Sequence, residues 1–105
     1  MTAYVIVDNV VTDAPAYQTY IDAITPTVPA YGGCYLVRGG DIVFADSDWR
    51  PPRLVMIAFA TREAALRWVE APELADLHAM RHRYATSRMI LVDGLDDGSL
   101  PEVPV

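Results

Sequence analysis

One short strand, closed by a glycine pair at each end, constrains this chain more than any other segment. Residues 31–40 read Tyr-Gly-Gly-Cys-Tyr-Leu-Val-Arg-Gly-Gly, so β-favouring side chains stand between two turn signals. We therefore expect a strand over residues 33–38 with a turn at either end. Arg38 closes this strand, at a position from which a charged side chain can reach into a cleft.

The rest of the chain alternates between strand-like and helix-like segments. Asp13 and Thr61 stand where helix N-caps belong, and Pro26 and Pro29 are placed to interrupt the first helix near its end. We expect strands at 3–10, 33–38, 53–59 and 88–93, a further short strand at 42–45, and helices that begin near 13, 61 and 72. The order is β-α-β-β-α-β, with a bent or doubled second helical region. This is the ferredoxin-like α+β pattern, a four-stranded antiparallel sheet with its helices on one face.

The length of the chain leaves room for one domain. Its 105 residues are too few for two hydrophobic cores. We assign residues 1–95 to the ferredoxin-like domain. Residues 96–105, which hold two prolines and three acidic side chains, form an extended C-terminal tail.

Both faces of the expected sheet are apolar. Alternation sets apolar side chains on both sides of each strand: Val55, Ile57 and Phe59 opposite Leu54, Met56 and Ala58; Ile90 and Val92 opposite Met89 and Leu91; and Val5 and Val7 opposite Tyr4 and Ile6. Helices cover only one face of such a sheet, and soluble monomers seldom expose an apolar patch as large as the other. We therefore expect a homodimer that packs sheet against sheet.

Composition excludes several classes of function. The formal net charge is −6, from 14 acidic and 8 basic residues, and the basic residues form no patch, so we expect no nucleic acid and no membrane surface as partners. Every basic residue is an arginine. This excludes enzymes that use a lysine to form a Schiff base, to anchor pyridoxal phosphate or to bind phosphate in a P-loop. We expect no cofactor.

Cys34 and the N-terminal segment bear on location. A single cysteine cannot form an internal disulfide and fits a reducing compartment. Residues 1–8 lack the basic segment of a signal peptide, and no apolar run approaches the ~20 residues of a membrane span. We therefore expect a cytoplasmic protein.

The two histidines are the first candidates for chemistry. His78 and His82 lie four residues apart, which places them on one helix face at a spacing that zinc sites use. The glutamate that follows the first histidine in metalloprotease helices is replaced by Ala79, and we expect no metal. His78 lies on the same stripe as Arg81, so it is a candidate general base beside an anion-stabilising arginine. The alternative is a structural, hydrogen-bonded histidine.

Arg38 and Cys34 are candidates on the glycine-flanked strand. Arg38 either binds a ligand or forms a salt bridge, because an unpaired buried charge is costly. Strict alternation places Cys34, Leu36 and Arg38 on one face, although a shift of one residue in register reverses that face. Cys34 is either a thiol activated by the arginine or a small buried side chain.

An aromatic set completes the list of candidates. We expect a flat organic ligand to be lined by substrate-binding residues Tyr17, Tyr20, Tyr35, Cys34 and Trp68. The alternative is that these aromatic residues are ordinary core.

Several short motifs together resemble the DUF1330 family over roughly residues 3–95. They are Tyr31 to Gly33, Leu36 to Gly40, Trp49, Pro51 to Arg53, Phe59, Ala71 to Glu73, and Thr86 to Arg88. The resemblance implies a dimeric α+β barrel with one cavity per subunit between sheet and helices. The wider superfamily includes cofactor-independent monooxygenases, isomerases, polyketide cyclases, haem enzymes and ligand binders, so the fold leaves the reaction open.

These observations lead to one functional expectation and a rival. The first is a cofactor-independent enzyme that isomerises, cyclises or rearranges an aromatic or polyketide-like molecule by acid–base catalysis. His78, Arg81 and Arg38 are its expected catalytic residues. The rival is a non-catalytic dimeric module that binds a metabolite or has a structural role.

Overall fold

Strands and helices follow one another in the predicted order. A computed structural model describes residues 2–95 of the chain, and the tail assigned to residues 96–105 lies outside them. The elements are β1 (Ala3–Val11), α1 (Ala14–Ile24), α2 (Thr27–Ala30), β2 (Gly33–Arg38), β3 (Arg53–Phe59), α3 (Arg62–Glu70), the 3₁₀ turn η1 (Pro72–Leu74), α4 (Ala75–Tyr84) and β4 (Ala85–Asp93). The last strand begins three residues earlier than predicted.

The predicted caps and breaks fix the helix ends. The Asp13 carboxylate accepts a hydrogen bond from the amide of Ala16, and the Thr61 hydroxyl accepts one from the amide of Ala64. At the other end of α1, the Thr25 hydroxyl donates to the carbonyl of Ile21 at 2.6 Å, and Pro26 has no amide to continue the helix. The chain then turns into the separate helix α2, as the proline pattern indicates.

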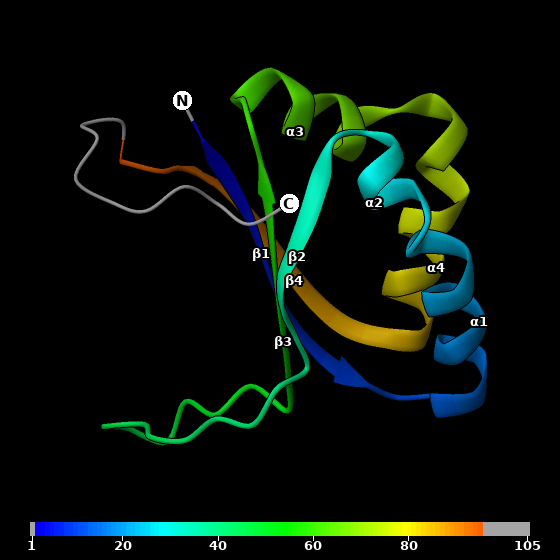
Figure 1. The fold of residues 1–105 in the computed structure, drawn as a ribbon. Helices are drawn as coiled ribbons and strands as arrows, with labels where there is room; N and C mark the ends of the chain where they lie inside the picture. Colours follow the sequence, from blue (N-terminus) through cyan, green and yellow to red (C-terminus); the bar gives the residue numbers. More distant parts are fainter. Residues whose placement is uncertain (1, 96–105) are drawn as a thin grey trace.

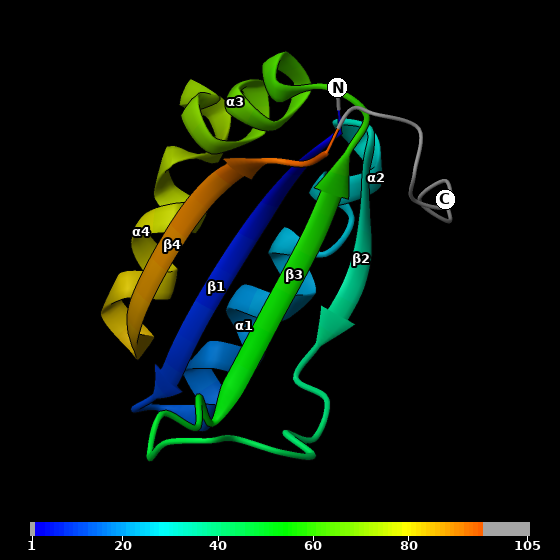
Figure 2. The same cartoon turned by 90° about the vertical axis from the view of Figure 1, so that its left-hand side faces the viewer.

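The four strands form one antiparallel sheet in the order β2-β3-β1-β4. Figures 1 and 2 show the helices together on one side of this sheet and none on the other. The ferredoxin-like α+β fold is therefore confirmed. The core lies in the layer between sheet and helices, where Val5, Ile57 and Phe59 from the sheet meet Trp68 and Val28. The same layer holds the cavity described below.

The predicted short strand at 42–45 does not form. Residues 40–52 have no strand assignment and project away from the sheet as a long loop (Figure 1), with Phe44 78% exposed. A strand needs a neighbour to satisfy its backbone groups; β3 is already paired on both sides, by β2 and by β1, and residues 40–52 do not return along the free edge of β2. The backbone carbonyl of Ile42 accepts a hydrogen bond from the Arg50 guanidinium instead.

A β-bulge at Leu36 overturns the prediction that Cys34 and Arg38 share one face of the sheet. Cys34 pairs with Ala58, but the register with β3 shifts between Tyr35 and Val37, and Arg38 pairs with Val55. The extra residue turns the end of the strand over. Cys34 and Arg38 therefore lie on opposite faces, with Arg38 on the helix side.

The second face of the sheet is uncovered within residues 2–95. Ile90 is 59% exposed and Val92 is 43% exposed there, and Figure 2 shows this face unobstructed by helices. The aromatic ring of Trp49, from the projecting loop, hydrogen-bonds the Asp8 carboxylate at its edge. We call this surface, formed by Ile6, Leu54, Met56, Ile90 and Val92, the open face.

Gly33 provides a test of the core packing. A Cβ atom at this position would lie 2.8 Å from the Phe59 ring and 2.9 Å from Val28, both fully buried. We expect Gly33→Ala to lower the free energy of unfolding by about 1–3 kcal/mol, because the packed layer cannot move apart without loss. Gly40→Ala is the matched control, since nothing lies within 4 Å of its Cβ position. Equal stability of the two variants in urea unfolding would contradict this account.

Candidate functional site

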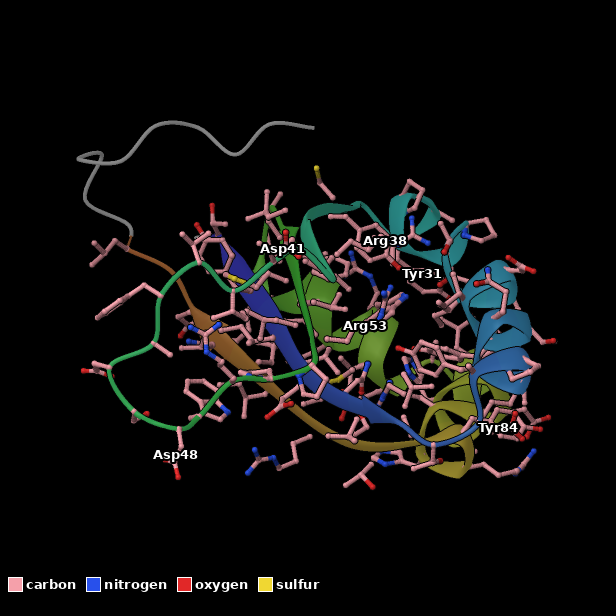
Figure 3. The ribbon with its side chains drawn as sticks, turned by 90° about the horizontal axis from the view of Figure 1, so that it is seen from below. Tyr31, Arg38, Asp41, Asp48, Arg53 and Tyr84 are labelled. Atoms are coloured by element: carbon pink, nitrogen blue, oxygen red, sulfur yellow. The ribbon has the colours of Figure 1, made fainter. Side chains whose placement is uncertain are left out.

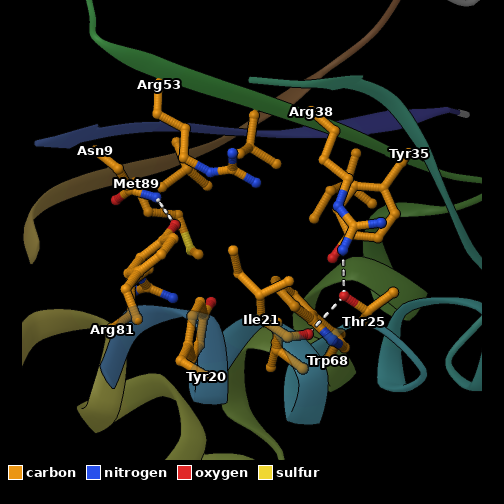
Figure 4. Close-up of a pocket in the computed structure, with 15 residues that line it drawn as sticks. Asn9, Tyr20, Ile21, Thr25, Tyr35, Arg38, Arg53, Trp68, Arg81 and Met89 are labelled. Carbon is orange, nitrogen blue, oxygen red and sulfur yellow. Dashed lines mark hydrogen bonds between the residues drawn. The ribbon is translucent and has the colours of Figure 1, made fainter. Parts of the chain in front are cut away.

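A narrow cavity lies between the sheet and the helices. Its walls come from β1, β2 and β3 on one side and from α1, α3 and α4 on the other, with Met89 from β4. The view from below in Figure 3 shows Arg38 and Arg53 pointing into this layer, while Asp41 and Asp48 lie out on the projecting loop. Figure 4 shows the cavity itself.

Arg81 is the most buried charged side chain of the cavity. It is only 4% exposed, and its guanidinium donates to the Ser87 hydroxyl at 2.9 Å and to two histidine rings, His78 Nδ1 at 3.1 Å and His82 Nε2 at 3.2 Å. Burial raises the pKa of Tyr20, and the adjacent Arg81 guanidinium opposes that rise. Burying a cation without a counter-charge costs several kcal/mol. A bound anion would offset this cost.

Two polar atoms in the cavity wall have no hydrogen-bond partner. Asn9 is 1% exposed, and its side-chain amide donates to the Tyr17 hydroxyl at 2.8 Å, but its carbonyl Oδ1 accepts no hydrogen bond. The Nε of Arg53, which faces Asn9 across neighbouring strands, is also buried without a partner. Buried polar groups are nearly always satisfied by protein, water or ligand. An unpaired acceptor beside an unpaired donor indicates that a polar ligand or water binds here.

Gly39 lets Arg53 reach this position. Its φ of +74° lies in the left-handed region that glycine tolerates, and a Cβ there would stand 2.6 Å from the Arg53 Nη1. The guanidinium therefore packs against the bare backbone at the end of β2. It also lies 5.7 Å from the centre of the Tyr17 ring. One of the glycine pairs that flank β2 thus shapes the site directly.

Arg38 stands at the mouth of the cavity. Its guanidinium donates to the Thr25 hydroxyl at 2.5 Å and lies 4.7 Å from the centre of the Tyr35 ring (Figure 4). These contacts join the end of α1 to β2. The salt bridge that the sequence left open as its alternative role is absent from residues 2–95, where the recorded ion pairs are Arg62 with Asp93 and Arg88 with Asp8.

The cavity wall is positively charged within an acidic protein. Arg38, Arg53 and Arg81 line it, and none of the acidic residues that the structure describes does. The chain as a whole carries a formal charge of −6. Three guanidinium groups around a low-dielectric space attract an anion strongly and repel a cation. Apart from Asn9 and Thr25, the rest of the wall is aromatic and aliphatic.

The inner cavity is small. Its free volume is about 30 Å³, which accommodates a few water molecules or the polar head of a ligand. Ligand pockets usually have volumes of about 300–1,000 Å³. A whole polycyclic molecule therefore does not fit in this conformation.

Most of the predicted substrate-binding residues do line the cavity. Tyr17, Tyr20, Tyr35 and Trp68 contribute to its wall, although the sequence could not distinguish them from core. The Trp68 indole donates to the Thr27 hydroxyl at 2.9 Å, which orients the ring. Cys34 does not line the cavity: it lies in β2 on the face opposite Arg38, and its thiol is 3.6 Å from the carbonyl of Tyr35.

His78 lies behind Arg81 and outside the cavity wall. An arginine only donates hydrogen bonds, so His78 Nδ1 is the acceptor and the proton resides on Nε2, which donates to the carbonyl of Trp68 at 3.1 Å. The ring also meets Trp68 edge-on, with centroids 4.8 Å apart. Burial, and then the Arg81 charge, lower the pKa of His78. Both ring nitrogens therefore make hydrogen bonds, one with Arg81 and the other with Trp68 of α3.

The two histidines do not converge on a metal position. Both accept hydrogen bonds from the same guanidinium. Within residues 2–95, no three His, Cys, Asp or Glu side chains gather as a metal site requires.

Asn9 and Arg53 are the site residues that sequence reasoning missed. A signal for both was present. The alternation that places Val5 and Val7 on the inner face reaches Asn9 two residues later, and the alternation through Val55 reaches Arg53 two residues earlier. Both lie at strand ends, where polar residues are usually read as solvated.

Comparison with known proteins agrees with this architecture. Residues 2–95 match the family described as "Domain of unknown function (DUF1330)". The chain belongs to this family. No curated protein matches its sequence.

Several solved structures share the fold at low sequence identity. A Rhodopseudomonas palustris protein of unknown function has a TM-score of 0.69 at 15% identity, with 90% of this chain and 83% of that chain covered. Rv0793 from Mycobacterium tuberculosis has a TM-score of 0.59 at 18% identity, covering 94% and 100% of the two chains. SnoaB, a cofactor-independent oxygenase from Streptomyces nogalater, has a TM-score of 0.54 at 13% identity, covering 94% and 97%. These likenesses concern the fold.

The His78 contacts predict how stability depends on pH. The pKa of His78 is lowered in the fold from its ordinary 6.5, so as pH falls through 6.5 the unfolded chain gains a proton that the folded chain does not. Stability is thus present above pH 6.5 and declines below it, with a slope of at most about 1.4 kcal/mol per pH unit. Urea unfolding between pH 7.5 and 5.5 measures this, above the range of the carboxylates.

The comparison uses a His82→Gln background, which leaves His78 as the single histidine. Adding His78→Gln, whose amide can make both of its contacts, is expected to flatten the slope. An unchanged slope would show that His78 is not the group responsible.

Proposed function

We propose that this protein is a cofactor-independent enzyme that acts on a small organic molecule whose reacting form is an anion. The observation that carries the proposal is the acid-free cavity with three arginines, one of them 4% exposed and without a counter-charge. Guanidinium groups held in place before the substrate arrives stabilise an enolate or carboxylate without reorganisation. An isomerisation, cyclisation or rearrangement passes through such an anion.

The residues divide into binding and positioning roles. Arg81 and Arg53 would hold the developing negative charge, and Arg38 would hold charge at the cavity mouth. The Tyr17 and Tyr20 hydroxyls reach the cavity and can exchange a proton with a bound molecule. His78 as the acid or base stays a prediction. To act so, it must first release either Arg81 or the Trp68 carbonyl.

The fold that this chain shares with known proteins is consistent with the proposal, but the proposal rests on the cavity. SnoaB is a cofactor-independent oxygenase on the same architecture. The sequence-based expectation of an aromatic or polyketide-like substrate is retained for the part of the substrate outside the inner cavity. Within residues 2–95 no helix has the length and apolar character needed to cross a bilayer. We propose action in the cytoplasm.

A non-catalytic metabolite binder is the second candidate. Both ring nitrogens of His78 are already hydrogen-bonded. Among residues 2–95, moreover, the cavity wall holds no carboxylate or imidazole that could abstract a proton. Both observations favour a binder over an enzyme. Binder and enzyme predict the same anion affinity but differ in turnover.

Pyruvate separates these candidates, because it is a small anion with exchangeable methyl protons. We expect it to shift the ¹⁵N NMR signals of the Arg53 and Arg81 Nε–H groups, and the protein to accelerate methyl exchange in D₂O. Arg81→Met should slow that exchange at least about tenfold, because an oxyanion donor is lost. Arg67→Met, an exposed arginine on α3, is the matched control.

Shifts without exchange support the binder. An absence of shifts at millimolar pyruvate contradicts anion binding in either form.

We also propose that the functional unit is a homodimer formed through the open face. Ile90 and Val92 expose apolar side chains there, as the two-faced sheet pattern predicts. Ile90→Asp should convert the dimer into a monomer, because a charge would be buried in the interface. Leu66→Asp, at an exposed position on α3, should leave the dimer intact. Sedimentation velocity reports both, and a monomeric parent protein would contradict the proposal.

A further inference from the structure

A larger depression on the protein surface adjoins the inner cavity. This outer depression has a volume of about 500 Å³ and lies between the end of α1, the start of α2 and strand β2. It shares four wall residues with the inner cavity: Ile21, Thr25, Tyr35 and Arg38. The two spaces are thus neighbouring compartments with a common boundary.

The compartments differ in size and chemistry. The inner one has a free volume of about 30 Å³, is cationic and contains the buried Nε–H of Arg53, a donor without a partner. The outer one is large enough for a drug-sized molecule, and Pro26, Pro29 and the Tyr35 ring give it flat apolar walls. A single ligand that occupies both needs a small anionic head and a flat apolar body.

Arg38 forms the boundary between the compartments. Its guanidinium is held across the boundary by the Thr25 hydroxyl at 2.5 Å and by the Tyr35 ring. A neutral hydroxyl is a weaker partner for a guanidinium than a carboxylate is. A passing carboxylate can therefore replace Thr25 as the partner of Arg38.

We propose that the substrate is an amphipathic monocarboxylic acid. Its carboxylate passes Arg38 into the inner cavity toward Arg53 and Arg81, and its apolar or aromatic body lies in the outer depression. This inference rests on the function proposed above and extends it by naming the class of substrate and the surface that binds its body.

Asp22 makes the site selective for a single charge. Its carboxylate lies on the wall of the outer depression, where it accepts a hydrogen bond from the Gln18 amide at 3.0 Å. A second carboxylate at the far end of the body would be repelled by it. The outer end of the substrate is therefore neutral.

Calorimetric titration with a graded set of acids tests the proposal. The probes are acetate, phenylacetate and 2-naphthylacetate, with 2-naphthylacetamide as the neutral isostere of the last. We expect phenylacetate to bind about tenfold or more tighter than acetate, and naphthylacetate tighter still, because each ring adds contacts in the outer depression. The amide should lose at least about tenfold relative to its acid.

Two variants and a control test where the carboxylate and the body of the ligand bind. Arg38→Met should weaken naphthylacetate by about tenfold and leave the amide unchanged. Asp22→Asn, which still accepts from Gln18, should strengthen 1,4-phenylenediacetate about two- to fivefold and leave phenylacetate unchanged. Arg67→Met should change none of these affinities. Circular dichroism and thermal unfolding check that each variant is folded.

The outcomes distinguish this inference from the function on which it rests. If acetate shifts the Arg53 signal but naphthylacetate binds no tighter than acetate, the outer depression is not the body subsite and the substrate class is wrong. If no acid binds or shifts that signal, the proposed function itself fails. Graded affinity that responds to both variants supports the proposal.

Discussion

The cost of burying an arginine without a carboxylate governs this structure. Arg81 enters the layer between sheet and helices from α4, and only hydroxyl and imidazole groups receive its hydrogen bonds. Because the penalty for an uncompensated buried charge amounts to several kcal/mol, the surroundings have to be arranged around it. His78 and Ser87 hold the guanidinium from two elements. The field of that charge then extends into a cavity whose wall also holds Arg38 and Arg53.

Each cavity arginine depends on a different local device. Arg38 depends on the bulge in β2, Arg53 on the bare backbone of Gly39, and Arg81 on the pair of histidines on its own helix. These devices lie far apart in the sequence, and the antiparallel order β2-β3-β1 brings the first two together. The charge of the cavity is thus a property of the whole fold.

The fold was predictable because its signals are local. Caps at Asp13 and Thr61, prolines after α1, and alternation along the strands each act within a few residues. The predicted strand at 42–45 was wrong, since residues 40–52 lead away from the sheet without pairing, and local composition does not reveal whether a segment pairs with an available edge. Asn9 and Arg53 could have been found by carrying the alternation two residues further. The position of His78 behind Arg81 could not have been predicted. The side-chain direction changes by about 100° from one helical residue to the next, and tertiary packing sets the orientation of the helix.

The bulge at Leu36 has a consequence for how this site can change over generations. β2 is an edge strand with one neighbour, so inserting or deleting a single residue disturbs the hydrogen bonds of one ladder only. At the bulge, loss of Leu36 leaves the later pairs of the strand in register, Val37 with Met56 and Arg38 with Val55, so both residues keep their faces. Loss of that one codon would therefore leave Arg38 in the cavity, with the glycine turns, the sheet order and the core in place. A lineage can shorten this edge strand by one residue without losing the cavity cation.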